Sequence, residues 1–126
     1  MKTILIVEDN EKNMKLVRDI LRHNGHATIE ALTGGEGVRL AIEKKPDLIL
    51  MDIQLPDIDG IEALRLIRAD RALDAVAVIA VSASVMPDDQ QKIVTSGFDA
   101  FITKPINLKQ FLETVRRFLA SGRHRP

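Results

Sequence analysis

The stretch Val76-Ala77-Val78-Ile79-Ala80-Val81 is the most hydrophobic part of the sequence. Six apolar residues in succession are typical of a β-strand that is covered on both faces. Four further short runs lie before and after it, and a segment with the helical spacing of apolar residues follows each run. The expected strands are residues 3–7, 27–31, 47–51, 76–81 and 98–103. We expect the strand at 76–81 in the centre of the sheet and the weakly apolar strand at 27–31 on its outside.

Each helical segment carries a stripe of apolar residues. The residues expected on the buried faces are Met14, Leu16, Val17, Ile20 and Leu21; Val38, Ala41 and Ile42; Ile61, Leu64 and Ile67; and Leu108, Phe111, Leu112, Val115, Phe118 and Leu119. A loop at residues 33–35 precedes the second helix. The fourth helix, which starts near Pro87, is mostly polar and has only Ile93 and Val94 to attach it. We therefore expect it to be among the least stable elements.

Strands that alternate with helices over connections of this length run parallel, and right-handed crossovers place the helices on the faces of the sheet. The sequence therefore predicts an α/β fold, a doubly wound (βα)5 sandwich around a five-stranded parallel sheet. A chain of 126 residues suits one such domain, whereas an eightfold barrel needs about twice the length. We assign residues 1–121 to the domain and residues 122–126 to a short basic tail.

The composition argues against several classes of function. The 18 basic and 18 acidic side chains cancel, which argues against a nucleic-acid-binding protein. The absence of cysteine removes disulfides and thiolate metal sites and suits the cytoplasm. No apolar run approaches the roughly 20 residues that cross a bilayer, and the first residues do not form a signal peptide. Without Trp or Tyr there is little to stack a flavin, which argues against a flavodoxin-like electron carrier.

Polar side chains stand at the carboxyl ends of four of the five expected strands. Glu8 and Asp9 follow the first strand, Asp52 the third, Ser82 the fourth and Lys104 the fifth. Ligands of open parallel sheets bind beyond these ends, so we expect the side chains to meet at one rim. Three carboxylates without His or Cys favour magnesium, and the hydroxyl and ammonium groups can bind phosphoryl oxygens. The combination indicates transfer of a phosphoryl group to a carboxylate.

The run Gly34-Gly35-Glu36-Gly37 looks like a phosphate-binding loop. It lacks the spacing of a dinucleotide-binding motif, however, and it follows the wrong strand. We interpret it as a loop and a helix cap.

Four motifs at the strand ends resemble the receiver domains of two-component response regulators, and the resemblance covers nearly the whole chain. They are Val7-Glu8-Asp9-Asn10; Met51-Asp52 followed by Leu55-Pro56 and Asp59-Gly60; Val81-Ser82-Ala83; and Lys104-Pro105. The resemblance implies a flavodoxin-like, CheY-like fold with the strand order 2-1-3-4-5. It also implies a phosphoaccepting signalling switch that binds other proteins, and not an enzyme.

The resemblance further implies how the carboxylates act. Asp52 is the phosphoacceptor, which takes a phosphoryl group from a kinase histidine. Mg²⁺ is held by Glu8, Asp9, Asp52 and the backbone carbonyl of Gln54. These roles rest on the match to the family and not on periodicity or composition.

The same resemblance implies roles for the other strand ends. Lys104 and Ser82 bind the phosphoryl oxygens, and the peptide bond between Lys104 and Pro105 is cis. Ser82 and Phe101 form the switch, in which the aromatic ring turns inward when the hydroxyl moves. Phe101 stands where the family often has Tyr, so the ring can make this movement but brings no hydroxyl.

Within the family, residues 10–16 and 45–56 are most similar to single-domain regulators of polar differentiation and cell-cycle signalling. The expected phosphoryl donor is a histidine kinase or a histidine phosphotransferase, and the expected docking face for a downstream protein comprises helix four, strand five and helix five. We expect a monomer or weak dimer in the cytoplasm, with neither nucleic-acid nor membrane partners.

Two alternatives stay open. One is a receiver domain excised from a hybrid histidine kinase, which shows a similar signature. The other is a haloacid-dehalogenase-like phosphohydrolase, which also forms an aspartyl phosphate with magnesium. The second is disfavoured because its nucleophile follows the first strand in an Asp-x-Asp pattern, which Glu8-Asp9-Asn10 does not supply.

Overall fold

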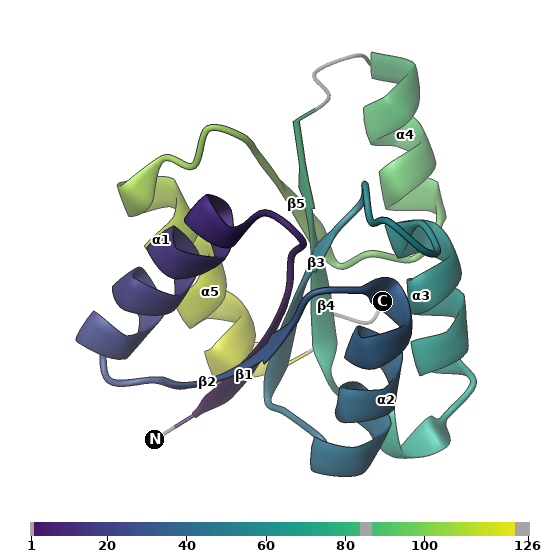
Figure 1. The fold of residues 1–126 in the computed structure, drawn as a ribbon, viewed down its shortest axis with the longest axis horizontal. Helices are drawn as coiled ribbons and strands as arrows, with labels where there is room; N and C mark the ends of the chain where they lie inside the picture. The colour runs from purple at the N-terminus through teal and green to yellow at the C-terminus, as the bar shows by residue number, and fades with distance from the viewer. Residues whose placement is uncertain (1, 84–86, 123–126) are drawn as a thin grey trace.

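A computed structural model describes residues 2–83 and 87–122 of the chain. In this part, five parallel strands form one sheet in the order β2-β1-β3-β4-β5, which confirms the predicted fold (Figure 1). The strands are β1 (Thr3–Val7), β2 (Ala27–Ala31), β3 (Leu48–Asp52), β4 (Ala77–Ser82) and β5 (Ala100–Thr103). The helices are α1 (Glu11–His23), α2 (Gly34–Lys44), α3 (Gly60–Arg68), α4 (Pro87–Thr95) and α5 (Leu108–Ser121), with a 3-10 helix, η1 (Arg71–Leu73), after α3.

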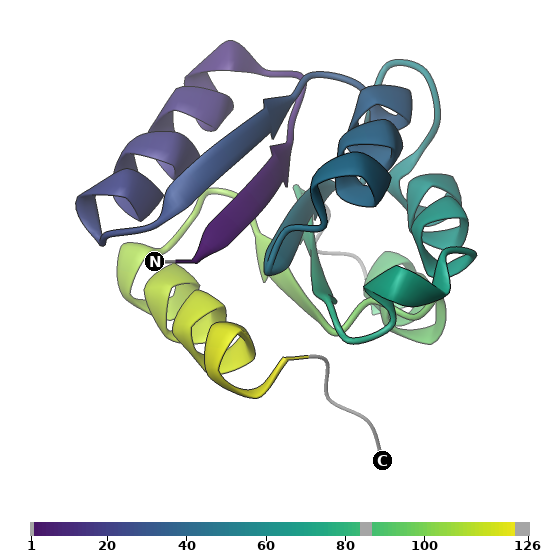
Figure 2. The same ribbon diagram turned by 90° about the horizontal axis from the view of Figure 1, so that it is seen from below.

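The helices form two layers, one on each face of the sheet. Helices α1 and α5 cover one face, and α2, α3 and α4 cover the other (Figures 1 and 2). Successive residues of a strand point to opposite faces, so Ile4 and Ile6 of β1 pack towards α1 and α5 while Leu5 and Val7 pack towards α2 and α3. This division explains why the strands read as continuous apolar runs.

The middle position of the sheet belongs to β3, and all five of its residues are buried. The most hydrophobic stretch, now β4, is an interior strand between β3 and β5 and is buried throughout. Strand β2 lies at an edge and only its last residue, Ala31, is buried, as its weak apolar pattern predicted. The parallel register pairs Asp52 with Val81 and Ser82 with Thr103, so these strands end at the same level.

Three apolar residues predicted to be buried are exposed. Leu16 of α1 keeps 47% of its surface accessible, Ile42 of α2 keeps 41% and Leu108 of α5 keeps 55%. In α2 the buried face is made of small residues, Gly34, Gly37 and Ala41. A Cβ atom at Gly37 would lie 2.6 Å from Cγ2 of Val7, so the helix approaches the sheet too closely for a large side chain there. The face with the larger residue, Ile42, therefore turns towards solvent.

Several element boundaries also differ from the prediction. The predicted loop at 33–35 is wrong in part, because Gly34 and Gly35 open α2 and the Thr33 side chain caps it by accepting from the Glu36 amide at 3.1 Å. Strand β5 begins at Ala100, two positions later than predicted. The Asp99 carboxylate accepts the Val78 amide at 2.8 Å, so a side chain takes a bond that a longer strand would supply from its backbone.

The amino-terminal and carboxyl-terminal limits of the domain stay predictions. Helix α5 ends at Ser121, and Gly122 follows with a positive φ of 67°. Of the predicted tail, residues 123–126 lie outside the described part of the chain. None of the helices in the described ranges is both long and apolar enough to cross a membrane.

Candidate functional site

The sheet brings together the strand-end residues that the sequence singled out. Glu8 directly follows β1, Asp52 closes β3, Ser82 closes β4 and Lys104 directly follows β5. Backbone hydrogen bonds continue past the strand ends: Glu8 N–H donates to Ala31 O at 3.0 Å, and Lys104 N–H donates to Ser82 O at 2.9 Å. These two bonds extend the hydrogen-bonding pattern of the sheet to the first residue after β1 and after β5.

Lys104 links two of the carboxylates. Its Nζ donates to Glu8 Oε1 at 2.9 Å and to Asp52 Oδ2 at 3.2 Å. Glu8 and Asp52 keep only 5% of their surface accessible, and the Lys104 side chain keeps 20%. One partly accessible ammonium thus faces two buried carboxylates.

Backbone amides fix the other oxygens of the same carboxylates. Gln54 N–H donates to Asp52 Oδ1 at 3.0 Å, and Asn10 N–H donates to Glu8 Oε2 at 3.1 Å. One oxygen of the Asp52 carboxylate therefore accepts a hydrogen bond from the loop that follows β3, and the other accepts one from Lys104. This pair of contacts sets the plane of its carboxylate.

Asp9 completes a cluster of three acids. One carboxylate oxygen each of Glu8, Asp9 and Asp52 can be chosen so that all lie within 4.8 Å of one another, and Asp9 is exposed to solvent. Three negative charges this close together repel, and a single lysine leaves most of that charge uncompensated. An oxygen-rich, acidic cluster of this kind suits a hard divalent cation.

The buried charges shift one another's protonation. Burial raises the pKa of Glu8, and the neighbouring Asp52 adds to the rise, while Lys104 and the Asn10 amide oppose it. Burial alone lowers the pKa of Lys104, but the hydrogen bond to Glu8 and the charges of Asp52 and Glu8 outweigh this effect and raise it. The ammonium therefore stays charged at neutral pH.

Ser82 is buried at 4% accessibility and faces a cavity of about 170 Å³. The cavity is lined by Ile53, Gln54, Asp59, Ile61, Ser82, Lys92 and Ile93. It opens between the loop after β3 and helix α4, so it adjoins the carboxylate cluster on the α4 side. Phe101 is half-buried against the same core that holds Ile93. The peptide bond between Lys104 and Pro105 is cis.

Two residues of the site region were given no role of their own from the sequence. Asn10 caps α1, since its side chain accepts the Asn13 amide at 3.0 Å, and an Asn before a helical stripe is a usual cap. Asp57, in the loop after β3, accepts the Gly34 and Gly35 amides at 2.8 Å each. Its partners lie more than 20 positions away, so no local pattern indicates the contact.

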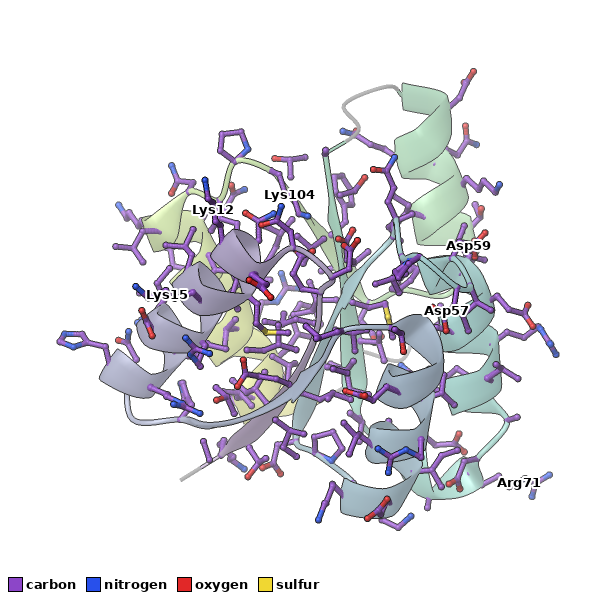
Figure 3. All side chains as sticks on the ribbon, in the orientation of Figure 1. Lys12, Lys15, Asp57, Asp59, Arg71 and Lys104 are labelled. Atoms are coloured by element: carbon purple, nitrogen blue, oxygen red, sulfur yellow. The ribbon has the colours of Figure 1, made fainter. Side chains whose placement is uncertain are left out.

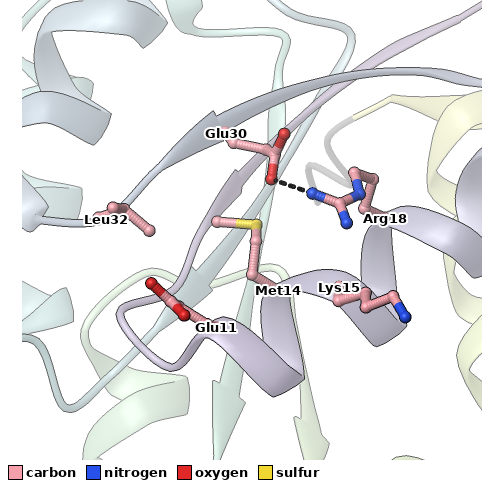
Figure 4. A pocket seen from close by; sticks show the side chains of 6 residues that line it. All are labelled: Glu11, Met14, Lys15, Arg18, Glu30 and Leu32. Atoms are coloured by element: carbon pink, nitrogen blue, oxygen red, sulfur yellow. Dashed lines mark hydrogen bonds and ion pairs between the residues drawn. The ribbon is translucent and has the colours of Figure 1, made fainter.

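A second hollow, of about 370 Å³, lies away from this cluster between α1 and β2 (Figure 4). It is lined by Glu11, Met14, Lys15, Arg18, Glu30 and Leu32. Arg18 Nη1 and Glu30 Oε1 form an ion pair at 2.9 Å within it. None of the strand-end residues lines this hollow, so it is separate from the candidate site.

Comparison with known proteins agrees with this geometry. The family model of the response regulator receiver domain matches residues 4–116. The polar-differentiation response regulator DivK of Brucella ovis is 46% identical over 121 residues, which span 96% of this chain and 98% of that protein. This similarity confirms the predicted resemblance to single-domain regulators of that kind.

Solved structures of receiver domains share the fold of this chain. The receiver domain of a sensor histidine kinase from Pseudomonas aeruginosa PAO1, with a magnesium ion coordinated in its active site cleft, is 32% identical with a TM-score of 0.89, covering 95% of this chain and 98% of that one. A CheY-like receiver domain protein from Methanospirillum hungatei JF-1 is 31% identical with a TM-score of 0.87, covering 95% and 94%. The family match, the shared fold and the rim of carboxylates around a lysine agree: this chain belongs to the response regulator receiver domain family.

Proposed function

We propose that the protein is a phosphoaccepting signalling switch in which Asp52 receives a phosphoryl group from a phosphohistidine. The observation that carries the proposal is the contact of Lys104 Nζ with Asp52 Oδ2 at 3.2 Å, beside two further carboxylates. A lysine in this place can bind an oxygen of a phosphoryl group that arrives at Asp52. The donor is a histidine kinase or a histidine phosphotransferase, and the exchange takes place in the cytoplasm.

In the proposed transfer, this chain supplies the attacking oxygen and the groups that bind the phosphoryl oxygens. An Asp52 oxygen attacks phosphorus, the new O–P bond forms, and the P–N bond to the imidazole breaks. The imidazole nitrogen takes up a proton as it leaves, and the product is an acyl phosphate. Lys104 Nζ and the Ser82 hydroxyl bind the phosphoryl oxygens, while the Gln54 amide holds the carboxylate plane through Asp52 Oδ1.

The donor set fits a magnesium ion. Glu8, Asp9 and Asp52 offer carboxylate oxygens within 4.8 Å of one another, and we assign the backbone carbonyl of Gln54 as a further ligand. Mg²⁺ prefers oxygen ligands, namely carboxylates, phosphoryl oxygens and the waters that it retains, and this cluster supplies the carboxylates. When bound, it neutralises charge that builds up on the phosphoryl oxygens during transfer.

The output of the switch is a change of binding surface. Ser82 and Phe101 lie on β4 and β5, next to α4, which has Ile93 as its buried anchor among the residues whose side chains are described. A phosphoryl group that draws the Ser82 hydroxyl towards Asp52 opens space for the Phe101 ring to turn inward. We assign the face of α4, β5 and α5 as the surface where a downstream protein binds, and the chain as a monomer or weak dimer.

The biological role follows from the relative. DivK of Brucella ovis is named as a regulator of polar differentiation, and its similarity extends over 96% of this chain. We propose the same kind of process, control of cell polarity and division, for this protein. It acts by binding other proteins and not by turning over a substrate.

Incubation with acetyl phosphate and magnesium tests the proposal. The wild type should take up one phosphoryl group that hydroxylamine removes, as expected for an acyl phosphate, and Asp52→Asn should take up none. A matched control, Asp19→Asn, changes an exposed aspartate and should behave as the wild type. Release of many equivalents of phosphate per protein in minutes would instead indicate a phosphohydrolase, and labelling that survives in Asp52→Asn would show that another residue is the acceptor.

A further inference from the structure

The loop after β3, residues 53–59, is hydrogen-bonded to helix α2 through the side chain of Asp57. Asp57 Oδ1 accepts the Gly34 amide at 2.8 Å and Asp57 Oδ2 accepts the Gly35 amide at 2.8 Å. Figure 3 shows Asp57 beside the amino-terminal end of α2. The two amides are the first of the helix and have no partner inside it, so an external acceptor satisfies them.

This contact also explains the glycine run that looked like a phosphate loop. The amides that such a loop would offer to a phosphate are occupied by a carboxylate of the same chain. Gly34 allows the loop to approach the helix closely, because a Cβ there would lie 2.5 Å from Ile58 Cγ1. A Cβ at Gly35 would make a tight contact of 3.1 Å with Asp57 Oδ2. The amides of Gly35, Ile58 and Gly34 hold the pKa of Asp57 below its usual range, so the carboxylate is charged at neutral pH.

The same loop contacts Asp52, the proposed phosphoacceptor. At its start, Gln54 N–H donates to Asp52 Oδ1 at 3.0 Å. At its end, Gly60 N–H donates to Ile53 O at 2.9 Å, and a Cβ at Gly60 would lie 2.7 Å from Asp52 O. The loop is therefore closed by hydrogen bonds near both of its ends, and between them Asp57 hydrogen-bonds it to α2.

We propose that Asp57 is a positioning residue that holds the loop on α2 and thereby fixes the Gln54 amide and carbonyl beside Asp52. This inference rests on the proposed function of the site. Without the two hydrogen bonds, the loop keeps its closure at Gly60 and the packing of Ile58 beside Gly34, but it loses its hydrogen-bonded attachment to α2. The Gln54 carbonyl is then less well placed for a metal ion, and the Asp52 carboxylate is less well oriented for attack.

The test compares Asp57→Ala and Asp57→Asn with a matched control, Asp47→Ala. Asp47 is also an exposed aspartate that accepts a backbone amide, that of Thr3 at 2.8 Å, but it precedes β3 at the opposite end of the sheet. The first readout needs neither metal nor phosphoryl donor: amide exchange followed by NMR in EDTA. We expect faster exchange at Gly34, Gly35 and Gln54 in Asp57→Ala, and no change at these amides in Asp47→Ala.

The second readout is the magnesium dissociation constant by calorimetry, together with the rate of labelling by acetyl phosphate. We expect Asp57→Ala to weaken magnesium binding roughly tenfold, the lower end of the loss seen when a group that orients a metal ligand is removed. Labelling should slow most at low magnesium, and Asp57→Asn, which keeps one acceptor oxygen, should recover part of both losses. Asp47→Ala should match the wild type in both.

Outcomes for the two proposals are separable. If the wild type is labelled and Asp57→Ala equals Asp47→Ala in Gln54 exchange, magnesium affinity and labelling rate, Asp57 has no positioning role. If the wild type itself takes no phosphoryl group, the proposed function fails, while the exchange and magnesium data still decide whether Asp57 holds the loop. Should Asp57→Ala fail to fold, Asp57→Asn provides the same comparison.

Discussion

Lys104 donates through Nζ to Glu8 Oε1 at 2.9 Å, although the two residues are 96 positions apart in the sequence. The contact closes the rim from β5 to β1, and Asp52 of β3 lies between them as the second acceptor of the same ammonium. A strand order that places β1 and β4 on either side of β3 makes this possible. We therefore expect the charge balance of these residues to affect both the stability of the protein and its proposed chemistry.

Asp52→Asn should stabilise the protein in the absence of magnesium. The substitution removes one of three clustered negative charges and hardly changes the shape of the side chain. Relief of one such repulsion stabilises the fold by on the order of 1 kcal/mol. Loss of the ion pair between Asp52 and Lys104 offsets part of this gain. The melting temperature in EDTA, followed by circular dichroism, should rise by about 4 °C for each kcal/mol. Magnesium should stabilise the wild type more than the variant. A lower melting temperature in EDTA with an equal response to magnesium would show that the three acids do not act as one site.

Lys104→Ala should have the opposite effect. The substitution leaves Glu8 and Asp52 buried without their lysine partner. Removing one partner of a buried ion pair lowers the free energy of unfolding by about 3 kcal/mol or more. We expect the lower value because the Lys104 side chain is partly accessible. Denaturant unfolding in EDTA measures this loss, and magnesium should restore part of it. Labelling of Asp52 should be slower than in the wild type. Lys109→Ala, which changes an exposed lysine of α5, serves as the control and should leave both measurements unchanged.

Binding of a beryllofluoride mimic of the phosphoryl group should change hydrogen exchange on the α4, β5 and α5 face. We expect the change in residues 87–108, because Ile93 is the buried apolar residue of α4 among the side chains that the structure describes, and Phe101 is only half-buried. Amides of β2, the edge strand at the opposite end of the sheet from β5, provide the internal comparison. Equal protection with and without the mimic across 87–108 would argue against this face as the output surface.

The contribution of Asp57 to stability should depend on pH. Its pKa in the folded protein is lowered, chiefly by the Gly35 amide and then by those of Ile58 and Gly34. A carboxyl whose folded pKa is depressed stabilises the fold above its unfolded pKa, about 3.9, and this contribution is lost as the pH falls through the folded pKa. The stability difference between wild type and Asp57→Asn should therefore be constant near neutrality and shrink below about pH 4.

Urea unfolding at several pH values measures this difference. Both proteins carry the same other acidic groups, including Glu36 in the first turn of α2 and Asp59 at the end of the loop, so the comparison isolates Asp57. Among the ion pairs of residues 2–83 and 87–122, none involves Asp57, so no basic partner complicates the comparison. A difference that stays constant down to pH 3 would mean that the charge of Asp57 is not what binds the two amides.

The strand-end positions of Glu8, Asp52, Ser82 and Lys104 could be predicted from the sequence. Strands and their alternation with helices are local patterns, and parallel strands joined by right-handed crossovers bring their carboxyl ends to one edge whatever the details of packing. The strand order itself came from the resemblance to the receiver family, because periodicity does not distinguish which strands are neighbours.

Only the tertiary structure decided which helix faces are buried and which distant groups meet. Leu16 and Ile42 are apolar but exposed, because burial depends on what lies opposite a helix and not on its own residues alone. Asp57 reads as a loop residue, yet its carboxylate binds the first amides of α2, 22 and 23 positions earlier. Such a contact forms only when the fold brings two elements side by side, and a local sequence pattern does not show which distant residues will meet.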